Sequence, residues 1–360
     1  MVQLQLRFTT KRSNSSQLSK SPARKRCGAF SFCTFSSAVK KILIIRFSSI
    51  GDIILTTPVI RCIRQQTGAE VHFITKKQFS AIPESNPYIS KVITIDKNVS
   101  EVADVLRSEN YDYVVDLHHN LRSLQVKNIC KVPAASFPKL NLKKWLLVNA
   151  RIDLMPQQHI VDRYFMAAEK LNVKNDNEGL NYFIPESDKV NPEVLPSVHR
   201  NGYIAITAGA KFATKEMPAA KMKELILYLN RPVVILGGKD DIAKGTFIAD
   251  ECGDLVYNAC GKFNLNQTAS LIEQADAVIA HDTGMMHIAA AFRKKIFSVW
   301  GNTVPQLGMY PYLPAEGSRI IQVKDLSCRP CSKIGYNECP KKHFRCMNDI
   351  PLEEFRELRA

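Results

Sequence analysis

A repeated pairing of a short apolar run with a polar turn is the feature of this sequence that most restricts its fold. In the first such pair, the aliphatic run Ile42–Ile45 precedes the small and polar turn Phe47–Asp52. A short, continuous apolar run is typical of a strand that is buried on both faces of a parallel sheet. Further runs of this kind lie at 71–74, 92–95, 113–117, 203–207, 232–236, 277–280 and 296–301, with helix-length segments among them. The alternation predicts βαβ units and hence an α/β protein with doubly wound sheets.

The apolar runs fall into two groups, which we interpret as two domains. At about 100–200 residues per domain, a chain of 360 residues has room for two. The stretch 184–201 separates the groups and is rich in Pro, Ser, Asp and Asn, as is typical of a linker. We predict a Rossmann-like domain over 40–190 and a second one over 195–345 that faces it across a cleft. A C-terminal helix is expected over 346–360, and packing back on the first domain is one option for it. Other expected helices begin near Ile53 and cover 219–229, 268–274 and 286–292.

Much of the positive charge of the chain lies near its N-terminus. The formal net charge is +15, and residues 1–40 hold eight Lys and Arg residues but no Asp or Glu. Such a charge favours an anionic partner, which can be a nucleic acid, a phosphate-bearing ligand or an anionic lipid surface. The Ser-rich segment 1–39 is open to three interpretations: a basic arm, an organellar targeting segment, or upstream sequence outside the folded protein. We favour a disordered extension and exclude it from the fold.

The turn Ser48–Asp52 is the first of three segments that lie where α/β proteins bind ligands, at the carboxyl end of a strand. Gly51 permits a tight turn or a close backbone approach. Asp52 falls at the start of a helix, where it is either a helix N-cap or a catalytic carboxylate at the cleft. The segment lacks the G-x-G-x-x-G spacing of nicotinamide dinucleotide sites, which argues against a dehydrogenase of the same fold class.

The other two segments offer groups that suit phosphates. In Gly209–Lys215, small residues, a hydroxyl and a lysine can cradle a diphosphate, although the P-loop spacing is absent and a solvated loop explains the segment equally well. In His281–His287, the backbone N–H groups of 282–284 fall at a strand–helix junction, where the helix dipole favours an anion. His287 lies one turn further on and is either a packed helix residue or a functional one.

The chain has ten cysteines and no secretory signal, so we expect reduced thiols of a cytosolic compartment and no disulfide framework. Four of them gather near the C-terminus together with one histidine: Cys328, Cys331, Cys339, His343 and Cys346. Their spacing is compatible with a zinc or iron–sulfur site. A structural zinc site usually has two close pairs of ligands, whereas six residues separate the second pair here. We therefore favour thiols that pack the last segment, and we expect no metal.

Taken together, these segments resemble glycosyltransferase family 9, the ADP-heptose:lipopolysaccharide heptosyltransferases of the GT-B fold. The resemblance covers about residues 40–357. It is carried by KILIIRFSSIGDIILTTPVIRCIR, YDYVVDLHHNLRS, TAGAKFATKEMP, VVILGGKDD, HDTGMMHIAAAF and CRPCSKIGYNECPKKHFRCM. The chain departs from the family pattern at Ala208, where a proline is usual, and at Met217, where a tryptophan is usual. Both departures bear on the shape of the donor pocket.

The resemblance implies roles for individual residues. Asp52 would be the catalytic base, and Lys215 would contact the diphosphate of the donor. Asp240 or Asp241 would hold the donor ribose, and Arg122 would face an anionic acceptor. The implied donor-binding residues are Gly209, Ala210, Lys215, Asp240, Asp241, Asp282, Thr283, Gly284 and His287. The implied acceptor-binding residues are Ser49, Gly51 and Arg122.

The resemblance also implies the reaction and its setting. The enzyme would be an inverting glycosyltransferase that moves a sugar, heptose from ADP-heptose, onto the inner core of lipopolysaccharide. It would need neither a cofactor nor a metal ion, and it would act as a peripheral protein on the cytoplasmic face of the inner membrane. Two alternatives stay open. One is a member of the same family with another nucleotide sugar or a different cell-surface glycan acceptor. The other is a basic nucleic-acid-binding protein, although no nucleic-acid motif follows residue 40.

Overall fold

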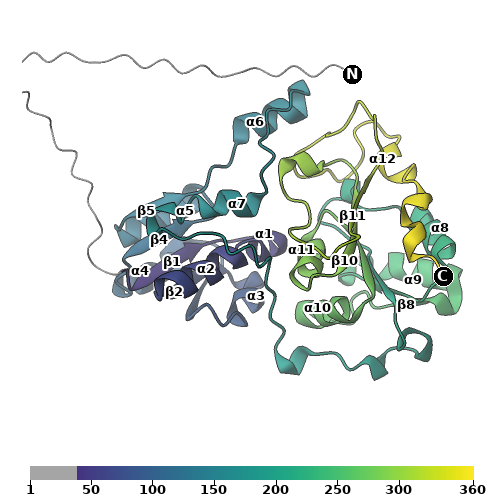
Figure 1. Cartoon of the computed structure of the whole chain (residues 1–360), viewed down its shortest axis with the longest axis horizontal. Helices are drawn as coiled ribbons and strands as arrows, with labels where there is room; N and C mark the ends of the chain where they lie inside the picture. Colours follow the sequence, from purple (N-terminus) through teal and green to yellow (C-terminus); the bar gives the residue numbers. More distant parts are fainter. Residues whose placement is uncertain (1–38) are drawn as a thin grey trace, which may run out of the picture. The chain divides into compact units, whose positions relative to one another are not determined.

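Two parallel sheets organise the protein (Figure 1). The computed structural model describes residues 39–360, so the predicted extension 1–39 lies, apart from Val39, outside the described residues. The first sheet consists of β1(Lys41–Ile45), β2(Glu70–Lys76), β3(Lys91–Ile95), β4(Tyr113–Asp116) and β5(Ala134–Ser136). The second consists of β6(Ile204–Thr207), β7(Val233–Leu236), β8(Val256–Asn258), β9(Ala277–His281), β10(Lys295–Trp300) and β11(Arg319–Gln322).

Both sheets have the strand order of a Rossmann fold. The first runs β3-β2-β1-β4-β5, and the second runs β11-β10-β9-β6-β7-β8, which repeats that order and adds a sixth strand. All strand pairs are parallel; Ile45 of β1, for example, pairs with Asp116 of β4. We call residues 40–183 the N-terminal lobe and 203–360 the C-terminal lobe. The predicted α/β class and the two Rossmann-like halves are confirmed.

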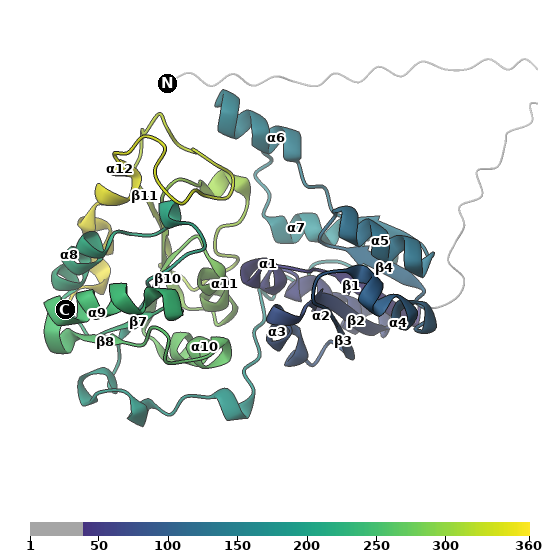
Figure 2. The ribbon, with the colours of Figure 1, turned by 180° about the vertical axis from the view of Figure 1, so that it is seen from behind.

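Helices connect the strands in both lobes, as the two opposite views in Figures 1 and 2 show. The N-terminal lobe contains α1(Ile50–Ile54), α2(Thr57–Thr67), α3(Ala81–Glu84), α4(Ala103–Ser108), α5(Leu121–Cys130), α6(Asn141–Trp145) and α7(Ile160–Phe165). The C-terminal lobe contains α8(Ala219–Leu229), α9(Ile242–Cys252), α10(Leu265–Gln274), α11(Gly284–Ala291) and α12(Arg345–Asn348). No helix within residues 39–360 combines the length and the apolar character that crossing a membrane requires.

The first helix begins earlier than its sequence predicts. Helix α1 starts at Ile50, three residues before the expected Ile53, because Ser49 serves as its N-cap. The helix ends at Ile54, and α2 follows from Thr57 with Pro58 in its first turn. A proline is tolerated there because its missing N–H would lack a helical partner in any case. Asp52 is therefore the third residue of α1 and not its N-cap.

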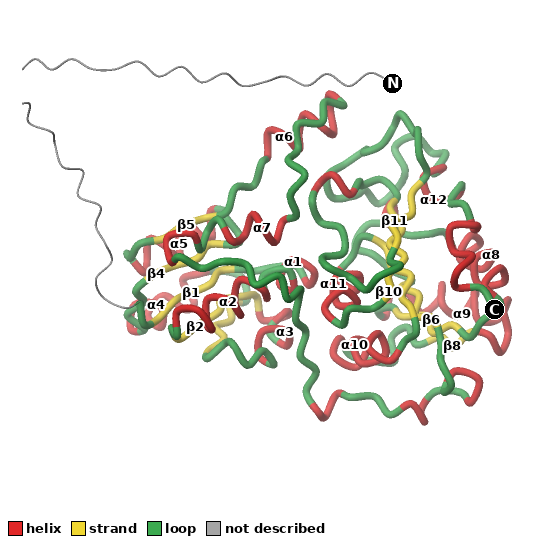
Figure 3. Tube along the Cα trace, viewed as in Figure 1, coloured by secondary structure: helices red, strands yellow, loops and turns green. Residues whose placement is uncertain are grey.

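The linker between the lobes and the C-terminal segment differ in how well they match their predictions. Short 3-10 turns interrupt the linker 184–201, which Figure 3 shows as a long loop between the lobes. The C-terminal segment 346–360 is not one helix, because Pro351 separates α12 from a 3-10 stretch, Leu352–Leu358. Its Phe355 is buried in the core of the C-terminal lobe and stacks on Phe297 of β10, with ring centroids 5.8 Å apart. The segment thus packs on its own lobe, although the sequence left packing on the N-terminal domain open.

Candidate active site

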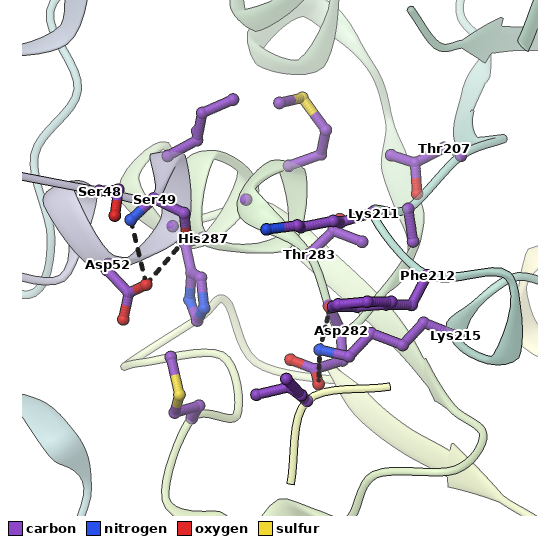
Figure 4. Close-up of a pocket in the computed structure, with 18 of the residues that line it drawn as sticks. Ser48, Ser49, Asp52, Thr207, Lys211, Phe212, Lys215, Asp282, Thr283 and His287 are labelled. Carbon is purple, nitrogen blue, oxygen red and sulfur yellow. Dashed lines mark hydrogen bonds and ion pairs between the residues drawn. The ribbon is translucent and has the colours of Figure 1, made fainter. Parts of the chain in front are cut away.

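A cavity of about 1220 Å³ lies at the carboxyl ends of the central strands and is lined by both lobes. The segments after β1, β2, β4 and β5 form its wall on the side of the N-terminal lobe. The turns after β6, β7 and β9 form the wall on the side of the C-terminal lobe. Parallel strands deliver all their carboxyl ends to one edge of a sheet, so segments far apart in sequence meet there. The three segments singled out from the sequence all line this one cavity (Figure 4).

Asp52 is held in place from two sides. The Ser49 hydroxyl donates to Asp52 Oδ2 at 2.8 Å, and the Ser49 backbone N–H donates to the same oxygen at 3.2 Å. The other carboxylate oxygen pairs with Arg46 Nη2 at 2.5 Å. Arg46 is itself buried and donates from Nη1 to the carbonyl of Leu117 at 2.5 Å. The Asp52 carboxylate therefore accepts the backbone N–H of the N-cap Ser49, as in a capping box, and at the same time faces the cavity.

The surroundings of Asp52 keep it ionised. Burial alone would raise the pKa of its carboxyl group. The charge of Arg46 and the hydrogen bonds from Ser49 outweigh burial and lower the pKa below its usual value. An ionised carboxylate at the cavity can accept a proton, which is the first requirement of a general base.

Helices α1 and α11 cross at two glycines, one from each lobe. A Cβ added at Gly51 would lie 2.6 Å from His287 Cδ2 and 3.2 Å from Gly284 Cα. A Cβ added at Gly284 would lie 2.7 Å from Ile50 Cγ2. Any side chain at either position would push the helices apart. This crossing brings the Ser48–Asp52 turn of one lobe against the start of α11 in the other.

The start of α11 presents buried polar groups that lack a partner within residues 39–360. These are the hydroxyl of Thr283 and Nδ1 of His287. Burial lowers the pKa of His287 to about 4, so its imidazole is neutral near pH 7. Thr283 and Gly284 line the cavity where the positive end of the helix dipole emerges. Polar groups left unpaired at a helix N-terminus suit an anionic ligand.

Lys215 reaches the same place from the turn after β6. Its ammonium group donates to Asp282 Oδ2 at 2.6 Å and to the Asp282 carbonyl at 3.2 Å (Figure 4). Thr303 also donates to Asp282 Oδ2, at 2.9 Å. Asp282 thus fixes the Lys215 ammonium beside the start of α11. The predicted donor residues of two separate segments are therefore in direct contact.

The turn after β6 is shaped by two residues that the sequence did not single out, Glu216 and Lys244. Glu216 Oε1 accepts the N–H of Ala210 at 2.9 Å, so the predicted phosphate donor Ala210 already has a partner. Lys244 donates to the Ala208 carbonyl at 2.8 Å and pairs with Glu216 Oε2 at 3.2 Å. Lys244 lies in α9 and Glu216 in a loop, so no sequence motif links them, and only the folded structure shows that they form a pair.

The next turn, after β7, places the acidic residues expected near a ribose. Asp241 accepts the N–H of Gly238 at 2.8 Å and lies so close to Gly209 that a Cβ there would meet its carboxylate. Burial raises the pKa of Asp241, and the hydrogen bond from Gly238 opposes this rise. Asp240 also lines the cavity and is exposed. Asp241 is therefore the more firmly positioned of the two candidates.

The two departures from the family pattern, Ala208 and Met217, are the buried end residues of the loop 208–217. Ala208 and Met217 both belong to the core of the C-terminal lobe. The Met217 N–H donates to His281 Nε2 at 2.9 Å, and the Ala208 N–H donates to the Leu236 carbonyl at 2.8 Å. The loop is thus fixed at both ends through its backbone.

A group of positive side chains lines the cavity, three of them from the N-terminal lobe and one, Lys333, from the C-terminal lobe, and the sequence did not single it out. It consists of Arg46, Lys139, Lys144 and Lys333. Burial and the neighbouring cations lower the pKa of Lys144 to about 8, and the same causes lower the pKa of Lys139. Within residues 39–360, none of the three lysines forms an ion pair with a carboxylate. Arg122, by contrast, is exposed on α5 and does not line the cavity.

Three of the C-terminal cysteines, Cys328, Cys331 and Cys339, lie in one loop, and Cys346 lies in α12 just after it. Cys328 Sγ lies 3.9 Å from His343 Nε2, and the Cys331 thiol donates to the Cys328 carbonyl at 2.9 Å. Cys339 and Cys346 are also free thiols. In the part of the chain that the structure describes, no three His, Cys, Asp or Glu side chains are arranged to hold a metal ion. The same loop contributes Lys333 to the cavity.

Comparisons with known proteins assign this architecture to a family. The sequence profile of glycosyltransferase family 9 (heptosyltransferase) matches residues 99–342. Lipooligosaccharide heptosyltransferase 2 of Haemophilus influenzae is 26% identical over 271 residues, which cover 70% of this chain and 78% of that protein. Lipopolysaccharide heptosyltransferase 1 of Pseudomonas aeruginosa is 25% identical over 344 residues, or 87% and 92% of the two chains. The solved structure of E. coli ADP-heptose lps heptosyltransferase II superposes with a TM-score of 0.67 at 21% identity, covering 88% of this chain and 98% of that one. The chain belongs to glycosyltransferase family 9 and has the GT-B fold.

Proposed function

We propose that this glycosyltransferase transfers heptose from ADP-heptose to the inner core of lipopolysaccharide, with inversion at the anomeric carbon. The observation that carries the proposal is the meeting of an ionised carboxylate, Asp52, with the Lys215–Asp282 pair in one cavity. The family and the names of the relatives, which are heptosyltransferases of lipopolysaccharide and lipooligosaccharide, support the choice of donor and acceptor.

In this proposal the donor diphosphate binds at the start of α11. There the Lys215 ammonium and the backbone N–H groups of Thr283 and Gly284 offer positive charge at one point. The unpaired Thr283 hydroxyl supplies a further hydrogen bond. Asp241, fixed against Gly209, is placed to accept hydroxyl groups of the ribose. The nucleotide therefore lies along the C-terminal lobe.

The transfer itself is a single displacement. The oxygen of an acceptor hydroxyl forms a bond to the anomeric carbon, and the bond from that carbon to the diphosphate oxygen breaks. The proton of the hydroxyl passes to Asp52, and the bonding electrons leave with the diphosphate. Attack opposite the leaving group inverts the anomeric centre through an oxocarbenium-like transition state. Because the pKa of Asp52 is low, the proton moves as the hydroxyl becomes acidic during bond formation.

We assign the group of positive side chains to the acceptor. Arg46, Lys139, Lys144 and Lys333 provide four cations beside Asp52. Such a group favours an acceptor that carries carboxylates or phosphates next to its reacting hydroxyl. This assignment takes the role that the sequence had given to Arg122.

Two further features belong to the same proposal. Transfer needs no metal ion, because Lys215 and the start of α11 can stabilise the charge that develops on the diphosphate. Excess chelator should therefore leave the rate unchanged, and a loss that Mg²⁺ restores would contradict this part. The enzyme works as a peripheral protein at the cytoplasmic face of the inner membrane, where the lipid-linked acceptor is presented.

The Asp52→Asn variant tests the reaction. It should bind ADP within about twofold of the wild type in calorimetry and lose transfer by at least about a hundredfold. Asp96→Asn, an exposed carboxyl of the same lobe, is the matched control and should transfer normally. An Asp52→Asn enzyme with a normal rate would remove Asp52 as the base.

A second arm of the experiment separates the proposed substrate from its alternative. Wild-type enzyme is assayed with ADP-heptose and with other nucleotide sugars, on lipopolysaccharide inner core and on other glycans, and NMR gives the anomeric configuration of each product. If another donor or acceptor is used at least about tenfold better, the heptose proposal fails while the transferase chemistry stands. A retained configuration would contradict direct displacement.

A further inference from the structure

We infer that the segment 138–156 is a docking face for an anionic lipid bilayer. This segment, which we call the α6 arm, connects β5 to α7 and contains α6 followed by a π-helical turn, Leu146–Ala150. In both views the arm stands away from the five-stranded sheet (Figures 1 and 2). The inference rests on the proposed function only in taking the acceptor to be lipid-linked.

The outer side of the arm is unusually apolar for an exposed surface. Leu142 is 71% exposed and Trp145, one helical turn further on, is 57% exposed. Ile152 and Leu154 follow at 49% and 53%. Single exposed apolar residues are ordinary, but four large ones within thirteen positions form a patch that favours a partner. Leucine and tryptophan on one side of a short helix are typical of an element that lies in the headgroup region of a bilayer.

The charge of the arm suits an anionic surface. Lys143 is exposed beside the apolar residues, whereas the Arg151 guanidinium donates to the Cys328 and Pro330 carbonyls of the C-terminal lobe. The arm contains four Lys and Arg residues against a single acidic residue, the exposed Asp153. Lysine and arginine can bury their aliphatic stems among lipid headgroups while their charges meet the phosphates. A protein partner would need acidic groups to match this charge, whereas an anionic bilayer presents them everywhere.

The inner side of the arm belongs to the active site. Lys139 and Lys144 line the cavity, and Leu147 packs with Val304 and Leu307 of the C-terminal lobe. Arg151 donates from Nη2 to the Cys328 carbonyl at 3.1 Å, which ties the end of the arm to the same lobe. One short element therefore joins the proposed lipid surface to the cations assigned to the acceptor. An acceptor anchored in the bilayer would meet these cations without leaving the membrane surface.

The two tryptophans of the chain allow a direct test on the full protein. Trp145 is exposed and Trp300 is only 1% exposed, so a change in fluorescence on binding reports the arm. The protein is mixed with vesicles of phosphatidylcholine and phosphatidylglycerol, some with brominated acyl chains. We expect a blue shift and quenching by the brominated lipid, both absent in Trp145→Phe. With phosphatidylcholine alone, we expect binding to be at least about tenfold weaker.

Matched variants distinguish vesicle binding through the α6 arm from the general effect of removing exposed apolar side chains. Leu142→Ala/Trp145→Ala should weaken co-sedimentation with the anionic vesicles by about thirtyfold or more. The control Leu227→Ala/Phe247→Ala removes side chains that are 49% and 47% exposed on the C-terminal lobe, and it should bind normally.

A second pair of variants tests the charge. Lys143→Glu should weaken vesicle binding by about twentyfold, since each charge near an anionic surface is worth roughly a factor of five. Lys170→Glu changes the same charge at another exposed site of the N-terminal lobe and should have little effect.

Three results would overturn the inference. The first is equal vesicle binding by the arm variants and their controls. The second is a blue shift without quenching by brominated lipid. The third is a vesicle-free dimer in light scattering that Leu142→Ala/Trp145→Ala abolishes, since the face would then bind a second copy. The vesicles contain no sugar acceptor, so failure here would leave the proposed transfer reaction untouched, and failure of the Asp52 test would leave the docking face untouched.

Discussion

Replacing Gly51 by alanine tests the close crossing of α1 and α11. The added methyl group would lie 2.6 Å from His287 Cδ2 and 3.2 Å from Gly284 Cα. Non-bonded carbon atoms prefer about 3.5–4.0 Å, so the crossing must open by roughly 1 Å. The α-helical conformation of residue 51 itself accepts alanine, and the cost is therefore one of space rather than of backbone strain.

The size of the effect follows from this crowding. Overpacking of this kind costs about 1–3 kcal/mol of unfolding free energy, which lowers the melting temperature by several degrees. Activity should fall more steeply. Asp52 is the next residue, and a shift of about 1 Å in a catalytic group costs on the order of a hundredfold in rate.

The assay combines thermal unfolding with kcat/KM and a double-mutant cycle. His287→Ala removes the ring that the new methyl group meets. Gly51→Ala/His287→Ala should therefore be less destabilised than the two single changes together, with a coupling of about 0.5–3 kcal/mol. Gly238→Ala is the control for unfolding, because the nearest atom to its added Cβ is 3.8 Å away. Wild-type melting and activity in Gly51→Ala, or strict additivity in the cycle, would refute the contact.

Three more predictions follow from the same structure. Arg46→Met removes the charge that lowers the pKa of Asp52, so the acidic limb of the kcat/KM–pH profile should move to higher pH. Arg46→Lys keeps the charge and should shift this limb less. An unchanged acidic limb in Arg46→Met would contradict the ion pair. His287 has a pKa of about 4 when folded, below its usual 6.5, so the unfolded chain binds the proton first and stability falls as pH drops from 6.5 toward 4. Urea unfolding should show about 3 kcal/mol more loss over this window in the wild type than in His287→Gln, because the other buried histidines with lowered pKa values, His118, His159 and His281, contribute equally in both proteins. Phe355→Ala should lower the free energy of unfolding, measured with urea, by about 3–5 kcal/mol, because the ring is fully buried against Phe297. A smaller loss would show that the C-terminal segment contributes little to the stability of its lobe.

The sequence predicted eight of the eleven strands within residues 39–360, and the meeting of the motifs, for one physical reason. It missed β5, β8 and β11, which are short and only partly buried. A buried parallel strand must be apolar on both faces, so runs such as Ile42–Ile45 and Val233–Leu236 are visible without any partner. The residues that follow such strands share one edge of the sheet. Asp52, Lys215 and Asp282 could therefore be expected in one place before any distance was known.

The rest depends on packing that no local pattern encodes. The α6 arm brings Lys139 and Lys144 to the cavity. The cysteine-rich loop brings Lys333 to the same cavity. Arg122 had the right charge and followed a recognisable motif, but its helix directs it outward. The position of the C-terminal segment was likewise undecided, since the apolar face around Phe355 fits a core without indicating which one.

The glycine crossing has a consequence for how such an enzyme can diversify. Because α1 and α11 meet backbone to backbone at Gly51 and Gly284, the spacing between proton acceptor and leaving group is built into the main chain. The outer walls of the cavity, with Glu216 on one side and Lys144 on the other, lie outside that contact. They can be exchanged residue by residue while the reacting distance stays the same. A single scaffold of this kind can adopt new sugars and new acceptors by changing its walls alone.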